Sequence, residues 1–173
     1  MDAPEAAPFH DGFVALFDVH FPRLYRYLDR LSGEPDLAAD VAQEAFVKLY
    51  RRGAMPDSPE AWLISVALNL FRNARSSRSR RGRLLTQVRS EGVLADPPPS
   101  PDQAVLTEES RLRVRRAIDR LPERERRLLL LRAEGYSYRD MAIALELNES
   151  SVGTLLARAR QAFRECYEDP DAP

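Results

Sequence analysis

Residues 135–164, GYSYRDMAIALELNESSVGTLLARARQAFR, decide the fold, because they predict two short helices with three residues between them. Ser137 is a good N-cap for the first helix, and Asp140 follows it in the capping-box position. Glu146 and Leu147 are expected to form the turn, and the asparagine after them can cap the second helix. So short a turn is typical of the helix-turn-helix, whose second helix enters a DNA major groove. The alternative is an αα-hairpin whose polar side only contacts water.

Both predicted helices have an apolar face. On the first helix this face consists of Tyr138, Met141, Ala142 and Leu145, and on the second of Val152, Leu156, Ala159 and Phe163. The opposite face of the second helix presents Ser150, Thr154, Ala157, Arg158 and Gln161. In a helix-turn-helix, this polar face would be the one that meets DNA.

Length and composition exclude several classes of protein. With 173 residues, 44% of them hydrophobic, the chain can form one domain or two small ones around a packed core. It has no apolar run of membrane-spanning length and no signal pattern at its start, so we expect a cytosolic protein without membrane insertion. A single cysteine, Cys166, excludes an internal disulfide and a multi-cysteine zinc site. The only histidines are His10 and His20, and no nucleophile–base pair is evident, so we expect no enzyme activity, no metal site and no cofactor.

Charge is unevenly distributed, although the formal net charge is −1. Residues 1–60 carry six basic and eleven acidic side chains, whereas residues 61–92 carry seven basic and one acidic. An acidic surface next to a compact basic one indicates two different partners, and the basic one is expected to meet phosphate. For the basic segment from Arg72 to Arg89, a solvated, arginine-rich helix end is the alternative.

Near the N-terminus, apolar residues repeat every three or four positions from Phe13 to Leu31 and predict amphipathic helix. Pro22 interrupts this pattern, so we expect two helices that meet at an angle, with Pro22 as the first residue of the second. His20 falls on the apolar side, where we expect it to pack rather than to bind a ligand.

A further helix is predicted over residues 37–52, with Asp36 as its cap. Spacings of three and four residues place four side chains on one of its faces: Asp40, Gln43, Glu44 and Val47. Two carboxylates, an amide and an exposed valine resemble a protein-docking surface more than an acid–base pair. The alternative is an ordinary solvated face.

The next helix starts at Ser58 and Pro59, an N-cap followed by a first-turn proline, and extends to about Arg81. The residues expected to face inward are Trp62, Leu63, Val66, Ala67, Leu70, Phe71 and Ala74. Trp62 could instead contact an unstacked base. The loop from Arg52 to Pro59 contains glycine, methionine and prolines, which suit a shaped loop able to hold a base.

A proline-rich segment divides the chain. Residues 96–102, DPPPSPD, are not expected to be helical and predict a stiff linker. Thr107 can cap a helix that extends to Arg120, and residues 122–134 form the next, which ends at Gly135. We therefore predict an all-α chain of two small helical domains. Its parts are a disordered tail (1–9), a first domain (10–83), a linker (84–105), a helix-turn-helix domain (106–167) and an acidic tail (168–173).

The order of these pieces resembles the bacterial sigma factors, and the short two-domain form resembles their extracytoplasmic-function (ECF) group. DVAQEAF at 40–46 looks like the family pattern D-L-V-Q-E-x-F, and AWLISVALN at 61–69 is similar to x-W-L-x-x-I-A-x-N. LPERERRLLLLRAEGYSYRDMAIAL at 121–145 looks like L-P-x-x-x-R-x-x-x-x-L…G-x-S-x-x-E-I-A-x-x-L, and ARAR at 157–160 fits x-R-A-R.

This resemblance implies a promoter-specificity subunit of RNA polymerase that is not an enzyme. The residues implied to bind the polymerase core, on the clamp helices of its β′ subunit, are Asp40, Gln43, Glu44 and Val47. Those implied to hold the melted −10 strand, together with loop 52–59, are Arg52, Trp62, Asn69, Arg72, Asn73, Arg75 and Arg78. The second domain would sit on the β flap and contact the −35 duplex through Ser150, Ser151, Thr154, Ala157, Arg158 and Gln161. The linker would thread through the polymerase.

The sequence departs from the family pattern at two places. Glu146 stands where the turn usually has glycine, and a left-handed residue there would cost about 1 kcal/mol. Gly153 and Leu155 stand where the recognition helix usually has basic residues, which weakens the expected −35 contact. The alternative function is a stand-alone helix-turn-helix regulator that binds duplex DNA without polymerase. The sequence leaves open whether an anti-sigma protein also binds the chain.

Overall fold

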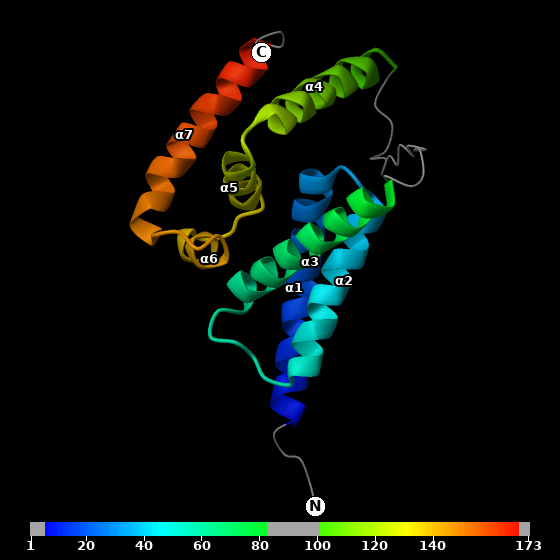
Figure 1. Cartoon of the computed structure of the whole chain (residues 1–173), viewed down its shortest axis with the longest axis vertical. Coiled ribbons are helices and arrows are strands. Elements are labelled where there is room, and N and C mark those ends of the chain that lie inside the picture. The colour runs from blue at the N-terminus through cyan, green and yellow to red at the C-terminus, as the bar shows by residue number, and fades with distance from the viewer. Residues whose placement is uncertain (1–5, 83–100, 170–173) are drawn as a thin grey trace, which may run out of the picture.

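The computed structural model describes residues 6–82 and 101–169, which form seven α-helices and no strand (Figure 1). The all-α prediction is therefore confirmed for these residues. The helices are α1 (Ala6–Ser32), α2 (Pro35–Arg52), α3 (Pro59–Gly82), α4 (Pro101–Arg120), α5 (Glu123–Ala133), α6 (Tyr138–Ala144) and α7 (Glu149–Glu168). None of the described helices is long and apolar enough to cross a membrane. Of the predicted tail 1–9, residues 6–9 belong to α1, and of the predicted tail 168–173, Glu168 belongs to α7. Residues 1–5 and 170–173 and the linker segment 84–100 lie outside the described residues.

Helices α1, α2 and α3 pack together around large apolar side chains (Figure 1). The fully buried members of this part of the core are Leu24, Tyr27, Leu28, Phe46, Leu49, Leu63 and Ile64. Ala38, Ala42 and Ala45 line the inner side of α2, and such small residues allow a close approach between helices.

The prediction of two helices meeting at Pro22 is wrong, because α1 continues through this residue. A proline inside a helix loses one backbone hydrogen bond and costs about 3 kcal/mol. The apolar side continues across it, with His20 and Leu24 both buried, while Pro22 itself is exposed. Packing on both sides of the proline therefore outweighs the local cost.

Two predicted helix starts are displaced. Glu34, not Asp36, is the N-cap residue of α2, and Pro35 occupies the first helical turn, where a missing N–H costs nothing. In the same way, α4 begins at Pro101 and not after Thr107, so the last residues of the proline-rich segment are helical. In both cases the proline starts the helix that it was expected to precede.

Helix α3 buries more than one face. The predicted inward residues Leu63, Ala67 and Phe71 are buried, but so are Ile64 and Leu68, which the sequence did not single out. This helix contacts α1 and α2 and also α6, so it needs apolar residues on more than one face.

The helix-turn-helix is formed by α6 and α7, and its predicted caps are confirmed. The Ser137 hydroxyl oxygen accepts a hydrogen bond from the Asp140 backbone N–H (3.0 Å), and the Asn148 side chain accepts one from the Ser150 N–H (3.2 Å). Met141 and Ala142 are buried as predicted, whereas Tyr138 is exposed. Val152, Leu156 and Ala159 of α7 are fully buried and Phe163 is partly buried, which confirms the apolar stripe.

The turn between these helices places Glu146 in the left-handed region, with φ of 55°. No other described residue except glycine has a positive φ. A left-handed residue is therefore present at the turn, without the glycine that would favour it.

Candidate nucleic-acid interface

The polar face of α7 is exposed, as predicted, at all six residues expected to meet duplex DNA: Ser150, Ser151, Thr154, Ala157, Arg158 and Gln161. Two of them make local side-chain hydrogen bonds. The Ser150 hydroxyl donates to Asn148 Oδ1 (2.9 Å), and Gln161 Nε2 donates to Glu165 Oε1 (2.8 Å). Buried Val152 and Leu156 fix the opposite side of the helix against the domain. A rigid helix with one free polar face can enter a major groove.

The predicted −10 residues lie along α3 and at the end of α2. Asn69, Arg72, Asn73 and Arg75 are exposed, and Asn69 Oδ1 accepts a hydrogen bond from Arg72. The Arg52 guanidinium lies 6.0 Å from the centre of the partly buried Trp62 ring, which brings the loop and the helix together. The side chain of Arg78 lies outside the described residues.

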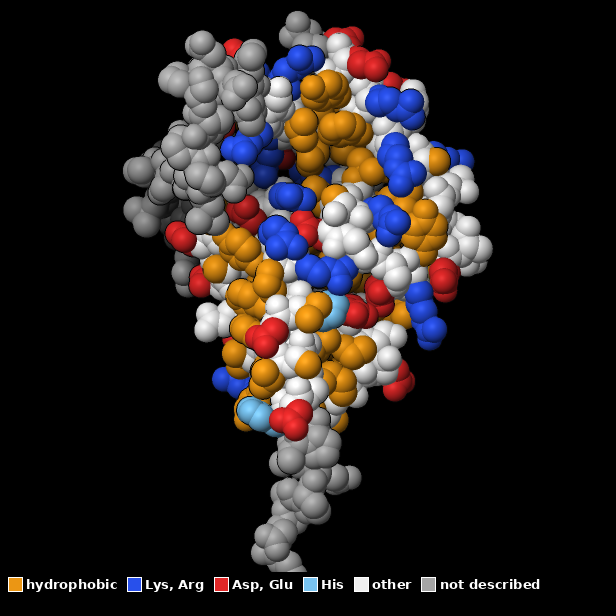
Figure 2. All heavy atoms as spheres, turned by 180° about the vertical axis from the view of Figure 1, so that it is seen from behind, with side chains coloured by type: hydrophobic (Ala, Val, Ile, Leu, Met, Phe, Trp, Pro, Cys, Tyr) orange, Lys and Arg blue, Asp and Glu red, His pale blue; other side chains and the backbone are white. Residues whose placement is uncertain are grey.

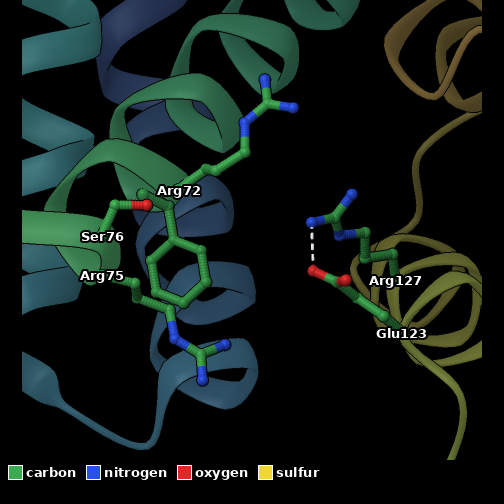
Figure 3. A pocket seen from close by; sticks show the side chains of 6 residues that line it. Arg72, Arg75, Ser76, Glu123 and Arg127 are labelled. Atoms are coloured by element: carbon green, nitrogen blue, oxygen red, sulfur yellow. Dashed lines mark hydrogen bonds and ion pairs between the residues drawn. The ribbon is translucent and has the colours of Figure 1, made fainter. Parts of the chain in front are cut away.

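Arg72 and Arg75 also line a cavity of about 350 Å³ between α3 and α5 (Figure 3). Its other lining residues are Phe71, Ser76, Glu123 and Arg127. The Arg75 guanidinium lies 5.6 Å from the centre of the Phe71 ring, and Glu123 pairs with Arg127 on the far wall. The cavity therefore has three guanidinium groups and one carboxylate, which favours an anion.

The predicted docking residues share one side of α2. Asp40 and Gln43 are exposed, and Glu44 lies 4.0 Å from Lys48 one helical turn away. Val47 was predicted to be exposed but is partly buried, because it packs beside the aromatic rings of α1 and α2. Gln43 and Val47 also line an apolar groove of about 390 Å³. This groove was not predicted, because the apolar repeat from Phe13 to Leu31 indicated only one face of an amphipathic helix.

The apolar groove is lined by aromatic rings from both helices: Phe13, Phe17, Phe21, Phe46 and Tyr50. Phe17 is 37% exposed and its ring stacks on that of Phe21, with centroids 4.8 Å apart. Figure 2 shows hydrophobic side chains reaching the surface toward the N-terminal end of the molecule. The signal in the sequence was the recurrence of phenylalanine every four residues at Phe13, Phe17 and Phe21, which places three large rings along one helix face.

His20 packs as predicted. It is buried, its Nε2 atom lies 3.2 Å from Glu60, and its Nδ1 atom lies 3.4 Å from Arg23. Burial lowers the pKa of the imidazole, against the opposing effect of the Glu60 carboxylate. No group of His, Cys, Asp or Glu among the described residues could hold a metal ion.

The fold and its exposed helix define a helix-turn-helix DNA-binding protein. Two family models match the chain: "Sigma-70 region 2" over residues 16–81 and "Sigma-70, region 4" over residues 111–163. The first covers α1 to α3 and the second covers the helix-turn-helix.

Several sigma factors are similar to the chain. The RNA polymerase sigma-H factor of Pseudomonas aeruginosa is 36% identical over 76% of this chain and 73% of its own length. The ECF RNA polymerase sigma-E factor of Escherichia coli is 33% identical over 72% of this chain and 70% of its own length. The ECF sigma factor SigE of Mycolicibacterium smegmatis is 31% identical over 84% of this chain, which spans only 58% of that relative.

Two solved structures share the fold. The sigma factor RpoE of Bartonella quintana, in complex with the anti-sigma factor NepR, has a TM-score of 0.66 and 24% identity, and covers 94% of this chain and 99% of its own. CnrH in complex with the cytosolic domain of CnrY has a TM-score of 0.61 and 22% identity, and covers 97% of both chains. The chain belongs to the sigma-70 family of RNA polymerase sigma factors, in its extracytoplasmic-function group.

Proposed function

We propose that the chain binds core RNA polymerase, directs it to promoters with −35 and −10 elements, and helps to melt the −10 region. The observation that carries this function is the capped α6–α7 pair with its exposed polar face, in the same chain as a region 2 unit. The stand-alone regulator finds no support among the family models or the relatives.

Polymerase binding is assigned to α2. Asp40, Gln43 and Glu44 offer two carboxylates and an amide to a basic or polar partner, and Val47 joins this face to the apolar groove. A polar rim next to an apolar centre is the usual composition of a protein–protein interface. We therefore propose that the core contacts both the acidic face and the groove.

The melted −10 strand is assigned to α3 and the loop before it. Arg72 and Arg75 supply charge for phosphate, while Asn69 and Asn73 supply amides for base edges. Trp62 is only partly buried and lies beside Arg52, so its ring can stack on an unpaired base.

The −35 duplex is assigned to α7. Arg158 is the main cation on the predicted face, and Ser150, Ser151 and Thr154 supply hydroxyl groups. Because Gly153 and Leu155 carry no charge, phosphate attraction on this helix is weak, and we expect the domain to depend on polymerase for duplex binding.

The test is reconstitution with purified core polymerase. The chain should co-elute with the core and support run-off transcription only from promoters that hold both elements. A matched assay with the chain alone on the same duplex separates the two functions. Tight, sequence-specific duplex binding without core, together with no core association, would show a stand-alone regulator instead.

A further inference from the structure

The two halves of the chain meet at one nearly buried carboxylate. Glu134, the C-cap residue of α5, has a side chain that is only 4% exposed. Its Oε2 atom lies 2.9 Å from Arg26 Nε and its Oε1 atom lies 2.7 Å from Arg30 Nη1. Its backbone carbonyl accepts a hydrogen bond from Arg23 Nε (3.0 Å). One residue of the second half is therefore bound by three arginines of α1.

The arginines are arranged for this contact. Residues 23, 26 and 30 are three and four positions apart, which places them on one face of a helix. They meet the C-terminal end of α5, where the helix dipole also favours positive charge. Figure 2 shows that Lys and Arg side chains gather across the middle of the molecule when it is seen from behind, beside a histidine.

Two neighbouring contacts extend the interface. The Arg23 guanidinium lies over the buried Tyr136 ring at 4.4 Å, and burial raises the pKa of the Tyr136 hydroxyl. Arg115 of α4 donates a hydrogen bond from Nη1 to the Arg30 carbonyl (3.0 Å). The buried apolar core is continuous here as well, because residues of α1, α3, α5 and α6 belong to one cluster.

The buried Glu134 carboxylate favours two discrete arrangements of the two halves of the chain. While the halves are in contact, its charge is balanced by two ion pairs. If α5 moves away, the carboxylate is hydrated by water instead. An intermediate separation would leave a buried charge without a partner, which is strongly unfavourable. The interface should therefore be either closed or open.

The closed arrangement conflicts with promoter binding. The proposed −35 and −10 contacts lie on different helices, α7 and α3, and bind separate stretches of one promoter, which the closed chain would have to reach at the same time. A compact chain of this length has a radius of gyration of about 16 Å. In addition, Glu123 and Arg127 of α5 stand across the cavity from Arg72 and Arg75, so in the closed chain α5 covers one side of the proposed −10 residues (Figure 3).

We propose that Glu134, Arg26 and Arg30 form an intramolecular clasp that holds the free chain closed and must open before both promoter elements are bound. The clasp is a property of the free chain, and only its purpose rests on the proposed function. Arg23 and Arg115 support the closed form through backbone carbonyl groups.

The test measures the distance between the halves in the full-length free chain. Cys166 of α7 is the only cysteine, so Asp36→Cys, at an exposed site on α2, allows a fluorophore pair to report separation by energy transfer. Two clasp variants are compared with the parent: Glu134→Gln, and Arg26→Ala combined with Arg30→Ala. Glu109→Gln, at an exposed site on α4, is the control for the loss of one carboxylate.

Energy transfer should be high in the parent and in the control, and should fall in both clasp variants. The open fraction should rise about tenfold or more, because each variant leaves a buried charge or donor without its partner. The arginine pair keeps the test valid if Glu134→Gln fails to fold, since both arginines are about half exposed. Unchanged energy transfer in a folded clasp variant would overturn the proposal.

Affinity for core polymerase is the second measurement. If only the open form binds, the apparent affinity rises in proportion to the open fraction, so the clasp variants should bind core more tightly by a similar factor. Opening without any change in core affinity would refute the inhibitory role. If the clasp variants open but neither they nor the parent bind core, the clasp proposal is supported and the proposed function is refuted.

Discussion

Arg115 fills the space that any side chain at Gly33 would occupy. Gly33 directly follows α1 and has φ of 70°, and a Cβ atom there would collide with the Arg115 guanidinium. The same guanidinium donates to the Arg30 carbonyl, so a glycine in the first half allows an arginine of the second half to approach the backbone.

Gly33→Ala should therefore lower the free energy of unfolding for two reasons. The left-handed backbone costs about 1 kcal/mol for alanine. Displacement of Arg115 removes a hydrogen bond worth about 1 kcal/mol more. Gly53→Ala is the matched control, because Gly53 has φ of 68° and no atom lies within 4 Å of the position that its methyl group would take. Urea denaturation should show a larger loss at position 33, and equal losses would contradict the role of Arg115.

Glu146→Gly should stabilise the chain by about 1 kcal/mol, because it removes a side chain from a left-handed residue. Glu149→Gly, in the first turn of α7, should instead destabilise it, because glycine is unfavourable in a helix. Thermal and urea unfolding report both changes. A loss of stability at position 146 would show that the Glu146 side chain makes a contact that outweighs the strain.

Asp40→Arg combined with Glu44→Arg should strongly reduce binding to core polymerase without unfolding α2, because neither residue is buried. Asp36→Arg, an exposed site on the same helix, is the control for charge reversal. Circular dichroism checks the helix content, and binding of a labelled chain to core checks the affinity. Core affinity that stays at the parent value in the folded double variant would remove the assignment of this face.

Arg158→Ala should weaken promoter binding by the holoenzyme by about 1–3 kcal/mol and relax the −35 preference, if the guanidinium contacts a base edge. If it contacts only phosphate, affinity should fall equally on all sequences and the salt slope should drop by about one. Arg164→Ala, also exposed on α7, is the control. Binding to promoters with −35 substitutions, measured at several salt concentrations, distinguishes these two results. If Arg158→Ala changes neither the affinity nor the −35 preference, α7 does not face DNA.

Acidification should destabilise the chain through His20. Burial lowers the pKa of this imidazole in the folded chain below its ordinary value of 6.5, so the unfolded chain binds the proton more readily. The stability that the folded chain gains from keeping His20 neutral is therefore present above about pH 6.5 and is lost as the pH falls below it. Glu60 and Asp140 oppose the shift and Arg23 reinforces it.

His20→Gln should reduce the slope of unfolding free energy against pH over the range from about pH 7 to pH 5.5. His10→Gln, at an exposed site near the start of α1, is the control and should keep the parent slope. A parent slope that persists in His20→Gln would assign the acid sensitivity to other groups.

The parts of the fold that depend on local chemistry were predictable from the sequence. The caps at Ser137 and Asn148 each join a side chain to a backbone N–H two or three residues away, so neighbouring residues specify them. The left-handed residue at Glu146 has no such local signal, and only the resemblance to the family pattern pointed to it. The helix at Pro22 was not predictable, because packing by residues distant in sequence decides whether a proline interrupts a helix.

In the candidate site, too, features set by neighbouring residues were predictable, whereas contacts between residues distant in sequence were not. The exposed face of α7 follows from its periodicity, and all six predicted residues lie on it. The interface at Glu134 joins residues 104 to 111 positions apart, and a single glutamate before a glycine gives no local signal of it. The apolar repeat in α1 predicted the apolar face of an amphipathic helix, and the structure leaves part of that face open as a groove.

The bond between Glu134 and Arg30 joins two points of one chain, so dilution cannot separate them. Each group meets the other at an effective concentration fixed by the connecting chain. A competing carboxylate on a separate molecule is therefore at a disadvantage equal to the factor by which its concentration falls below that effective concentration. To open the molecule, a partner must gain that factor from contacts elsewhere, and the acidic face and aromatic groove of the first half remain accessible for them.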